Sequence, residues 1–330
     1  MTQAKPAGVG EFGRIRRYFA PLAAGYPGAL NLTDDAALID LPAGERLVVT
    51  TDAMVAGVHF IGDEPADSLG RKALRVNLSD LAAMGATPVA YSLALVLPKS
   101  IDDEWVAGFA AGLDADQREF AIALSGGDSV ATPGPITISI TAFGRVGRGY
   151  LSRSGAKAGD DVYVSGTIGD AALGLDLLQG RLSLPESEAA GLIDRYRLPR
   201  PRLGLGRALV GVASGALDVS DGLMADLSHL AAESGLAARV EAARLPLSSG
   251  GRAAMALNPA FTRSRALSGG DDYELLFTAS PTNHYKVMEI ASAQGVSVTL
   301  IGKMMEGRGV VALAEDGQDV TPAVLGYRHG

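Results

Sequence analysis

Aspartates beside serine, threonine or glycine recur along this chain in short segments that could bind metal ions and phosphate. The segments are Thr33-Asp34-Asp35, Thr50-Thr51-Asp52, Asn77-Leu78-Ser79-Asp80, Ser125-Gly126-Gly127-Asp128, Asp218-Val219-Ser220-Asp221 and Ser268-Gly269-Gly270-Asp271-Asp272. Mg²⁺ prefers oxygen ligands and usually binds through a few carboxylates, water molecules and substrate phosphates. The segments therefore predict a protein that handles nucleotide phosphates.

These segments must be positioned by strands and helices, which alternate along the chain. Stretches that are β-branched, apolar or alternating predict strands at about 47–51, 91–97, 136–141, 162–164, 217–219 and 274–278. Helices are expected at about 69–84 and 103–118, from Asp170, from about Leu223, and from Pro281 with Ser280 as its cap. We therefore expect an α/β protein of the α+β type.

Length and a repeated tetrapeptide indicate two domains. A chain of 330 residues exceeds the usual size of a single core. A second series of strands and helices begins after Gly147-Arg148-Gly149, and Ser-Gly-Gly-Asp occurs once on each side of that point. The expected domains are residues 1–150 and 151–330, both of α/β type.

Composition and charge exclude several classes of protein. With 47% hydrophobic and 20% charged residues, the chain has the composition of a globular protein with a sizeable core. A formal net charge of -8, without a basic run longer than Arg16-Arg17, argues against a nucleic-acid partner. The absence of cysteine excludes disulfides, thiolate metal sites and cysteine nucleophiles.

No segment of the sequence predicts secretion or membrane insertion. The arginines near the N-terminus lead into a mixed stretch that lacks the apolar core of a signal peptide. The longest apolar run, Val89 to Leu97, is too short to span a bilayer. We expect a cytoplasmic protein without a membrane partner.

Asp80 is the most informative single aspartate. On its expected helix it shares a face with apolar side chains one turn before and one turn after it. A buried lone carboxylate is costly, so it needs a metal ion or a partner. The alternative to a metal ion is an ion pair with Arg71, Lys72 or Arg75.

Asp52 and Asp128 each follow a strand-like run. Open α/β sheets bind ligands beyond the carboxyl ends of their strands, and Gly126-Gly127 would let backbone N–H groups approach a phosphate. The alternative is that Gly-Gly-Asp forms a simple turn. Several such aspartates together favour a binding site.

Asp218 and Asp221 repeat this arrangement before another helix. Ser220 and Asp221 can cap that helix, and a helix N-terminus also binds anions, so capping and binding are compatible. Other phosphate-binding patterns are missing, because the chain has no G-x-x-x-x-G-K-[ST] loop and Ser165 to Gly169 lacks the full G-x-G-x-x-G pattern.

Taken in order, the motifs of this chain resemble those of a known family. They are Asp34-Asp35, Thr50-Thr51-Asp52, Val55 to Phe60, Val76 to Ala86, Gly126-Gly127-Asp128, Arg153 to Lys157, Asp218 to Leu223 and Ser268 to Leu275. This set resembles the thiamine-monophosphate kinases, which belong to the superfamily of aminoimidazole ribonucleotide synthetase. The likeness extends from Gly10 to about Tyr327.

The resemblance implies that ATP phosphorylates thiamine monophosphate to thiamine diphosphate with the help of several Mg²⁺ ions. The metal ligands that it implies are Asp34, Thr50, Thr51, Asp52, Asp80, Asp128, Asp218 and Asp221. The implied ATP contacts are Gly127, Asp128, Arg153 and Ser220, and the implied thiamine phosphate contacts are His59, Asp271 and Tyr327. The N-terminal domain would bind ATP and Mg²⁺ and contribute its sheet to a homodimer interface, and the C-terminal domain would complete the nucleotide and substrate site.

Two positions depart from the family pattern. Asp271 stands where the family commonly has Glu, which puts its direct contact with the substrate in doubt. Thr33 stands where the family has Gly, a change that leaves the metal carboxylates in place.

The chemistry of the reaction agrees with this assignment. ATP, a phosphate monoester and several carboxylates crowd negative charge that only several divalent cations could offset. A phosphate monoester has a second pKa of about 6, so its attacking oxygen is already largely deprotonated at neutral pH. We therefore expect direct in-line transfer without a protein general base.

Two other functions stay open at this point. Aminoimidazole ribonucleotide synthetase could share the glycines and aspartates, and a non-catalytic nucleotide-binding or metal-binding protein could keep the scaffold. Selenophosphate synthetase and the hydrogenase maturation factor of the superfamily depend on a reactive Cys or selenocysteine, which this chain lacks.

The segment 89–97 also bears on assembly. It is apolar on both faces, too apolar for an exposed edge strand, so it should be covered. The resemblance indicates that a second subunit covers it.

Overall fold

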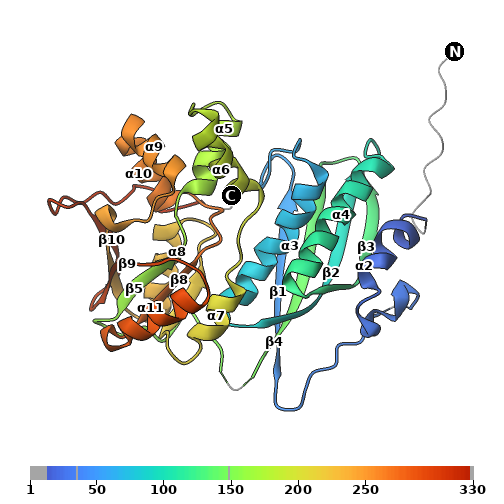
Figure 1. Cartoon of the computed structure of the whole chain (residues 1–330), viewed down its shortest axis with the longest axis horizontal. Coiled ribbons are helices and arrows are strands. Elements are labelled where there is room, and N and C mark those ends of the chain that lie inside the picture. The colour runs from blue at the N-terminus through green and yellow to red at the C-terminus, as the bar shows by residue number, and fades with distance from the viewer. Residues whose placement is uncertain (1–12, 35, 148, 328–330) are drawn as a thin grey trace. The chain divides into compact units, whose positions relative to one another are not determined.

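The computed structural model describes residues 13–34, 36–147 and 149–327. The chain divides into two compact units (Figure 1). Unit 1 comprises Met1–Leu78 and Pro88–Arg145, and unit 2 comprises Ser79–Thr87 and Val146–Gly330. Of the residues singled out in the sequence, Asp35 and Arg148 lie outside the described residues.

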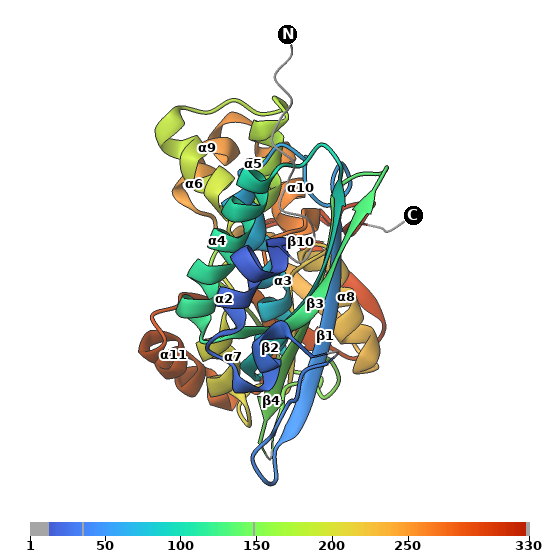
Figure 2. The ribbon, with the colours of Figure 1, turned by 90° about the vertical axis from the view of Figure 1, so that its right-hand side faces the viewer.

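Unit 1 is built on a four-stranded sheet in the order β1-β4-β2-β3. Its strands are β1 (Arg46–Val55), β2 (Thr87–Pro98), β3 (Ala123–Thr132) and β4 (Thr137–Val146). Two long helices, α3 (Ala66–Ala83) and α4 (Asp103–Phe120), cover one face of this sheet (Figure 2). Three short helical segments precede β1: η1 (Ile15–Phe19), α2 (Ala20–Ala23) and η2 (Pro27–Leu32).

Local sequence explains where these elements lie. Helix α4 begins where the Asp102 carboxylate accepts a hydrogen bond from the N–H of Trp105, and it ends at Ala121, whose φ of 53° is left-handed. In β4, Ile138 and Ile140 are buried between partly exposed neighbours. The alternation predicted for this strand is confirmed, as are the helices expected at about 69–84 and 103–118.

The apolar segment 89–97 is covered in part within this chain, and its coverage by a second subunit stays a prediction. The segment is part of β2, an interior strand between β4 and β3. Tyr91, Leu93, Leu95 and Leu97 are buried within this one chain. Neighbouring strands pair with both edges of β2, and the chain buries one face of it, which explains much of its apolar character.

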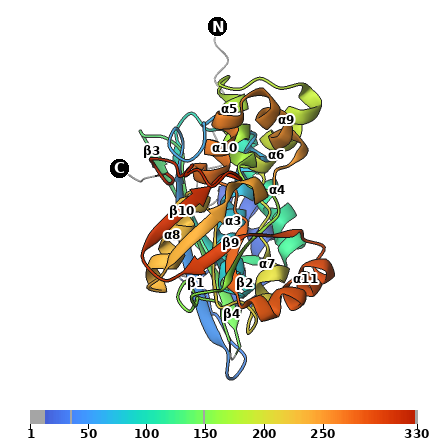
Figure 3. The ribbon, with the colours of Figure 1, turned by 90° about the vertical axis from the view of Figure 1, so that its left-hand side faces the viewer.

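Unit 2 contains a six-stranded mixed sheet in the order β10-β7-β9-β5-β8-β6. Its strands are β5 (Asp161–Ser165), β6 (Gly215–Asp218), β7 (Ala237–Glu241), β8 (Leu275–Ala279), β9 (Val298–Met305) and β10 (Gly309–Leu313). Strand β5 pairs antiparallel with both β8 and β9, whereas β10 pairs in parallel with β7. Strands β9 and β10 are labelled in Figure 3.

The helices of unit 2 include those expected from Asp170 and Leu223, which are confirmed as α5 and α8. The helices are α5 (Asp170–Leu178), α6 (Glu186–Arg197), α7 (Leu203–Leu209), α8 (Leu223–Glu233), α9 (Ser249–Leu257), α10 (Pro259–Ser268) and α11 (His284–Ala293), with short turns η3 (Ala242–Arg244) and η4 (Pro281–Asn283). The helix expected from Pro281 begins as η4 and continues as α11. Ser280 caps η4 as predicted, because its hydroxyl accepts a hydrogen bond from the N–H of Thr282.

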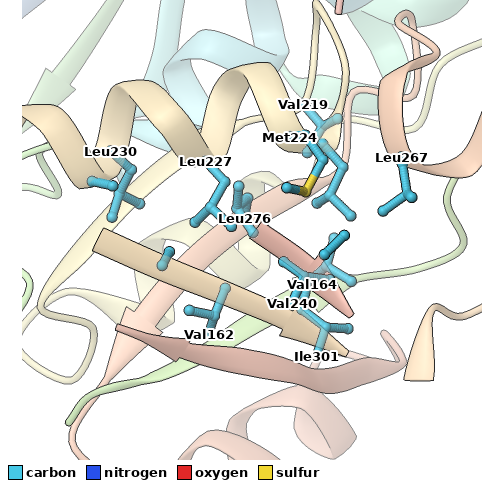
Figure 4. Packing of buried hydrophobic residues seen from close by; sticks show 14 of the residues in the cluster. Val162, Val164, Val219, Met224, Leu227, Leu230, Val240, Leu267, Leu276 and Ile301 are labelled. Atoms are coloured by element: carbon cyan, nitrogen blue, oxygen red, sulfur yellow. The ribbon is translucent and has the colours of Figure 1, made fainter. Parts of the chain in front are cut away.

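The core of unit 2 lies between α8 and the sheet. Met224, Leu227 and Leu230 of α8 point toward Val164 and Leu276 on the strands (Figure 4). All five side chains are fully buried, and burying a side chain of this size contributes about 1.5–3 kcal/mol. This core fixes the start of α8, where the chain enters from β6.

Within the described ranges, none of the helices has the length and apolar character needed to cross a membrane.

Candidate functional site

A pocket of about 570 Å³ in unit 1 is lined by the segment before β1 and by β2, β3 and β4. Its polar lining includes Asp34, Gly127 and Asp128, and its apolar lining includes Phe19 and Phe143. The predicted metal ligands Asp34 and Asp128 and the predicted ATP contacts Gly127 and Asp128 therefore line one pocket.

Strand β4 connects this pocket to the predicted ligands on β1. Ser139 and Thr141 line the pocket. The Ser139 hydroxyl donates to the carbonyl oxygen of Asp52 at 3.1 Å, and the hydroxyls of Thr51 and Thr141 lie 2.9 Å apart. The N–H of Asp52 donates to Oδ1 of Asn77 on α3 at 3.2 Å. These bonds fix the backbone that carries the predicted ligands Thr50, Thr51 and Asp52.

The sequence pattern predicted that Asp52 and Asp128 lie beyond the ends of their strands, and this prediction is wrong. Both β1 and β3 continue past these residues. The turn considered for Gly-Gly-Asp is also wrong, because Gly126 and Gly127 pair with β2 in a parallel ladder. A Cβ atom on Gly127 would lie 2.0 Å from the carbonyl oxygen of Leu93. The missing side chain lets β2 approach closely, so β3 continues through Gly126, Gly127 and Asp128 after a shift in register at Ser125.

His59 lies in a tight turn after β1. Its Nδ1 accepts a hydrogen bond from the N–H of Val55 at 3.1 Å. In the neutral ring this bond makes Nε2 the protonated nitrogen. His59 can therefore present one N–H donor.

The last residues of α3 belong to unit 2 and include the predicted metal ligand Asp80. The Ser79 hydroxyl donates to Oδ2 of Asp218 at 2.6 Å, and the two residues are only 1% and 5% exposed. Asp218 is the last residue of β6. Asp80 follows Ser79 and is partly buried. Arg71 and Arg75, considered as ion-pair partners of Asp80, both form ion pairs with Asp116.

The Ser220 loop, residues 218–222, leads from β6 into α8. Its three N–H groups at Ser220, Asp221 and Gly222 all donate to Oδ2 of Asp226, at 3.0 to 3.1 Å. The prediction that Ser220 or Asp221 caps α8 is wrong, because the cap residue is Gly222 and no side chain caps the helix there. The amides that could have bound an anion at this helix end are bonded to a carboxylate of α8 itself.

Burial makes the Asp226 carboxyl an unusual acid. It raises the pKa of Asp226 to about 7, and the charge of Asp221 adds to this rise, whereas the three N–H donors oppose it. Sequence reasoning missed Asp226, although its position one helical turn after Gly222 was a usable signal.

The Asp271 turn, residues 269–273, lies beside the Ser220 loop. The N–H of Asp271 donates to the carbonyl oxygen of Ser220 at 2.8 Å, and the N–H of Tyr327 donates to that of Asp221 at 2.9 Å. The structure thus brings together two predicted substrate contacts, a predicted ATP contact and two predicted metal ligands, Asp218 and Asp221.

The backbone beside Arg153 lies at the opposite end of β6 from this group of residues. The N–H of Ala216 donates to the carbonyl oxygen of Ser152, beside the beginning of β6, whereas Asp218 ends that strand. Arg153 itself is exposed.

The predicted metal ligands are divided between the units. Asp34, Thr50, Thr51, Asp52 and Asp128 lie in unit 1, and Asp80, Asp218 and Asp221 lie in unit 2. In the part of the chain that the structure describes, no group of three or more Asp, Glu or His side chains could hold one metal ion.

Two family models match this chain. The model of the AIR synthase related protein N-terminal domain matches residues 33–146, and that of the C-terminal domain matches residues 157–314. The fold and the site are therefore those of a two-domain AIR synthase-related protein. The hydrogenase maturation protein HypE of Escherichia coli shares the fold at a TM-score of 0.78, with 21% identity.

More similar proteins narrow the class further. Thiamine-monophosphate kinase of Caulobacter vibrioides is 46% identical over 97% of this chain and 91% of the relative, and that of Escherichia coli is 42% identical over 97% and 98%. Among solved structures, thiamine-monophosphate kinase from Stenotrophomonas maltophilia has a TM-score of 0.80 and 44% identity over 87% of this chain and 90% of that one. AaThiL complexed with AMPPCP and TMP has a TM-score of 0.77 and 32% identity over 97% of each chain. The chain belongs to the thiamine-monophosphate kinase family.

Proposed function

We propose that this chain transfers the terminal phosphoryl group of ATP to the phosphate of thiamine monophosphate, forming thiamine diphosphate. The observation that carries the proposal is the 46% identity with a thiamine-monophosphate kinase over 97% of the chain. The complex of AaThiL with AMPPCP and TMP supports a site for both substrates in this fold.

The predicted ATP contacts are divided between the two units. Gly127 and Asp128 line the pocket of unit 1, and Arg153 and Ser220 belong to unit 2. We assign ATP and Mg²⁺ binding mainly to residues 1–150, and completion of the nucleotide and substrate site to residues 151–330.

The donor chemistry of the predicted ligands fits Mg²⁺. All of them offer carboxylate or hydroxyl oxygen, and Asp34 and Asp128 line the same pocket. One or two carboxylates with water and substrate phosphates suffice for Mg²⁺, so a cluster of three is not required. The ions would be held by Asp34, Thr50, Thr51, Asp52, Asp80, Asp128, Asp218 and Asp221. Bound there, Mg²⁺ would offset the phosphate charges and polarise the transferred group.

The substrate end would be formed by His59, Asp271 and Tyr327. The Nε2–H of His59 can donate to a phosphate oxygen, because Nδ1 accepts from the N–H of Val55. Tyr327 is 49% exposed and can stack on the cationic thiazolium ring. These groups bind and orient the substrate, whose own phosphate oxygen is the nucleophile and needs no general base.

A direct displacement predicts the configuration of the transferred phosphoryl group in the product. One in-line transfer inverts the configuration at the γ-phosphorus, whereas a phospho-enzyme route through two transfers retains it. ATP made chiral with γ-thiophosphate should therefore give the inverted product. Retention, or a trapped phospho-aspartate or phospho-histidine, would refute the mechanism.

A homodimer through the sheet of unit 1 is supported by exposed apolar side chains on that sheet. Leu47 and Val49 of β1 are 41% and 53% exposed, and Val130 of β3 is 47% exposed. Such side chains favour association. Sedimentation at micromolar concentration should then give about twice the chain mass of 33.9 kDa, and a clean monomer would exclude it.

The decisive experiment is a turnover assay with ATP, Mg²⁺ and thiamine monophosphate. Formation of thiamine diphosphate with ADP is expected, and activity should vanish with EDTA and return with Mg²⁺. Unphosphorylated thiamine should be a worse substrate by orders of magnitude, because its hydroxyl needs a base. Turnover of the substrate of aminoimidazole ribonucleotide synthetase, or ATP binding without turnover, would favour the alternatives.

A further inference from the structure

The Asp271 turn has a backbone that its residue types do not favour. Asp271 has a φ of 71° and Tyr273 a φ of 50°, although neither is glycine. Non-glycine residues keep left-handed backbone only where the surroundings determine it, and they are common in binding and catalytic sites. The contacts that hold this turn are therefore of functional interest.

On one side, the turn is bonded to the Ser220 loop. The N–H of Asp271 donates to the carbonyl oxygen of Ser220, and the N–H of Tyr273 donates to that of Val219, both at 2.8 Å. A Cβ atom on Gly270 would lie 2.5 Å from the Ser220 carbonyl oxygen, so glycine is needed for this approach. The two segments therefore move as one if either is displaced.

On the other side, the turn is held by Asp272, which lies between the two left-handed residues and is 1% exposed. Its Oδ2 accepts from the N–H of Gly169 at 2.6 Å, and its Oδ1 accepts from the N–H of Ala171 at 3.2 Å. Since these amides belong to the start of α5, the buried Asp272 side chain attaches the turn to that helix. Asp272 is thus an acid within a predicted binding motif that holds the backbone.

Arg195 on α6 supports the same turn from behind. Its Nη2 donates to the carbonyl oxygen of Asp272 at 3.0 Å and to Oε1 of Glu274 at 2.8 Å. Arg202 holds Glu274 through two further bonds, at 2.6 and 2.5 Å. Arg195, Asp272 and Glu274 are all buried.

Arg195 makes these bonds through only one of its two terminal nitrogens. Its Nη1 is buried and, among the described residues, has no hydrogen-bond partner. A buried donor without a partner is costly. Its other terminal nitrogen, Nη2, instead fixes the carbonyl group of Asp272.

We propose that Asp272 and Arg195 are positioning residues that hold the Asp271 turn in its left-handed conformation, so that Asp271 faces thiamine monophosphate. The proposal rests on the proposed function and adds two residues that do not touch the substrate.

The test compares Asp272→Asn with Asp176→Asn. Asparagine keeps the shape of Asp272 but sets an NH₂ group against one of two backbone N–H donors. Asp176 on α5 is a matched control, because it is 0% exposed and its carboxylate accepts bonds from Arg265 on α10 and from Arg181, which follows α5. Both variants replace a buried acidic side chain with an amide, but only Asp272 holds the turn.

Asp272→Asn should raise the KM for thiamine monophosphate at least 10-fold and the KM for ATP less. Hydrogen exchange should speed up at the amides of Asp271 and Tyr273, whose bonds to the Ser220 loop depend on the turn. Asp176→Asn should lower thermal stability but leave both KM values and these two amides unchanged. Equal kinetic effects of the two variants, or unchanged exchange in Asp272→Asn, would overturn the proposal.

Arg195→Lys is the second variant and carries the test if Asp272→Asn does not fold. Lysine keeps the charge near Glu274 but cannot reach two oxygens in the same geometry, so the KM for thiamine monophosphate should rise less than in Arg195→Met. Equal, wild-type-like values in both Arg195 variants would refute a positioning role. If the wild-type protein does not phosphorylate thiamine monophosphate, the proposed function fails, whereas the exchange experiment still reports whether Asp272 holds the turn.

Discussion

Ser79 joins the end of α3 to a predicted metal ligand, so Ser79→Ala should impair the use of Mg²⁺. The substitution removes one hydroxyl that donates to Oδ2 of Asp218 at 2.6 Å. Because Ser79 and Asp218 are 1% and 5% exposed, water cannot easily replace the lost donor. Ser79 is not itself a predicted ligand, and the carboxylate remains in place.

The size of the effect follows from the charge and burial of this bond. A hydrogen bond to a charged group contributes about 1.5–3 kcal/mol, so the free energy of unfolding should fall by about this amount. Loss of a group that orients a metal ligand typically costs about 10- to 100-fold in metal affinity or activity. We therefore expect a similar rise in the Mg²⁺ concentration that gives half-maximal turnover.

The assay measures thiamine diphosphate formation against Mg²⁺ concentration at saturating ATP. Ser68→Ala is the matched control on the same helix, because its hydroxyl bonds to the carbonyl oxygen of Pro65 and to no predicted metal ligand among the described residues. Ser79→Ala should shift the Mg²⁺ curve and Ser68→Ala should not. A stable Ser79→Ala protein with an unchanged Mg²⁺ curve would refute the role of this bond in placing Asp218.

Three further predictions concern other parts of the chain. Gly127→Ala should lower the free energy of unfolding by about 1–3 kcal/mol, because its Cβ would lie 2.0 Å from the carbonyl oxygen of Leu93. Denaturant titration checks this against Gly126→Ala, where no atom lies within 4 Å of the added Cβ. Equal losses in the two variants would contradict the prediction. Burial raises the pKa of Asp272 from 3.8 to about 8. Between these two pH values the folded protein keeps a proton that the unfolded chain has lost. The free energy of unfolding should therefore fall as pH rises, by up to about 1.4 kcal/mol per pH unit. Denaturation from pH 5 to 8 should show a flatter profile for Asp272→Asn, and an identical slope would count against the raised pKa. Tyr327→Ala should raise the KM for thiamine monophosphate by about 2- to 30-fold, the equivalent of 0.5–2 kcal/mol of stacking on a cation, while the KM for ATP changes less; Tyr285→Ala, which truncates a tyrosine that is 87% exposed, should change neither.

Local patterns were sufficient to predict many elements of the fold. The alternation of Ile138 and Ile140 with polar residues identified β4, and the apolar face after Gly222 identified α8. These predictions succeeded because periodicity and turn chemistry act over a few residues. The same patterns failed at Asp128, where the two preceding glycines suggested a turn. The close approach of β2 at Leu93, which keeps that segment extended, leaves no sign in the local sequence.

The sequence by itself determined the chemistry of the candidate site and the family. The aspartates with their small neighbours predict oxygen ligands for metal and phosphate, and their order along the chain is a property of the sequence alone. That order was enough to recognise the thiamine-monophosphate kinases, because recognition needs no contact to be known.

Only the tertiary structure decided which acids could bind a ligand and which hold the backbone. Asp221, Asp226 and Asp272 look alike in sequence, yet Asp226 and Asp272 are buried acceptors of backbone N–H groups. The partners that orient the site are distant, since Ser79 bonds to Asp218 139 residues away and Arg195 bonds to Asp272 77 residues away. The burial of a carboxylate and its hydrogen-bond partners depend on the path of the whole chain. They decide whether the carboxylate is solvated, binds a metal ion or accepts hydrogen bonds from the protein's own amides.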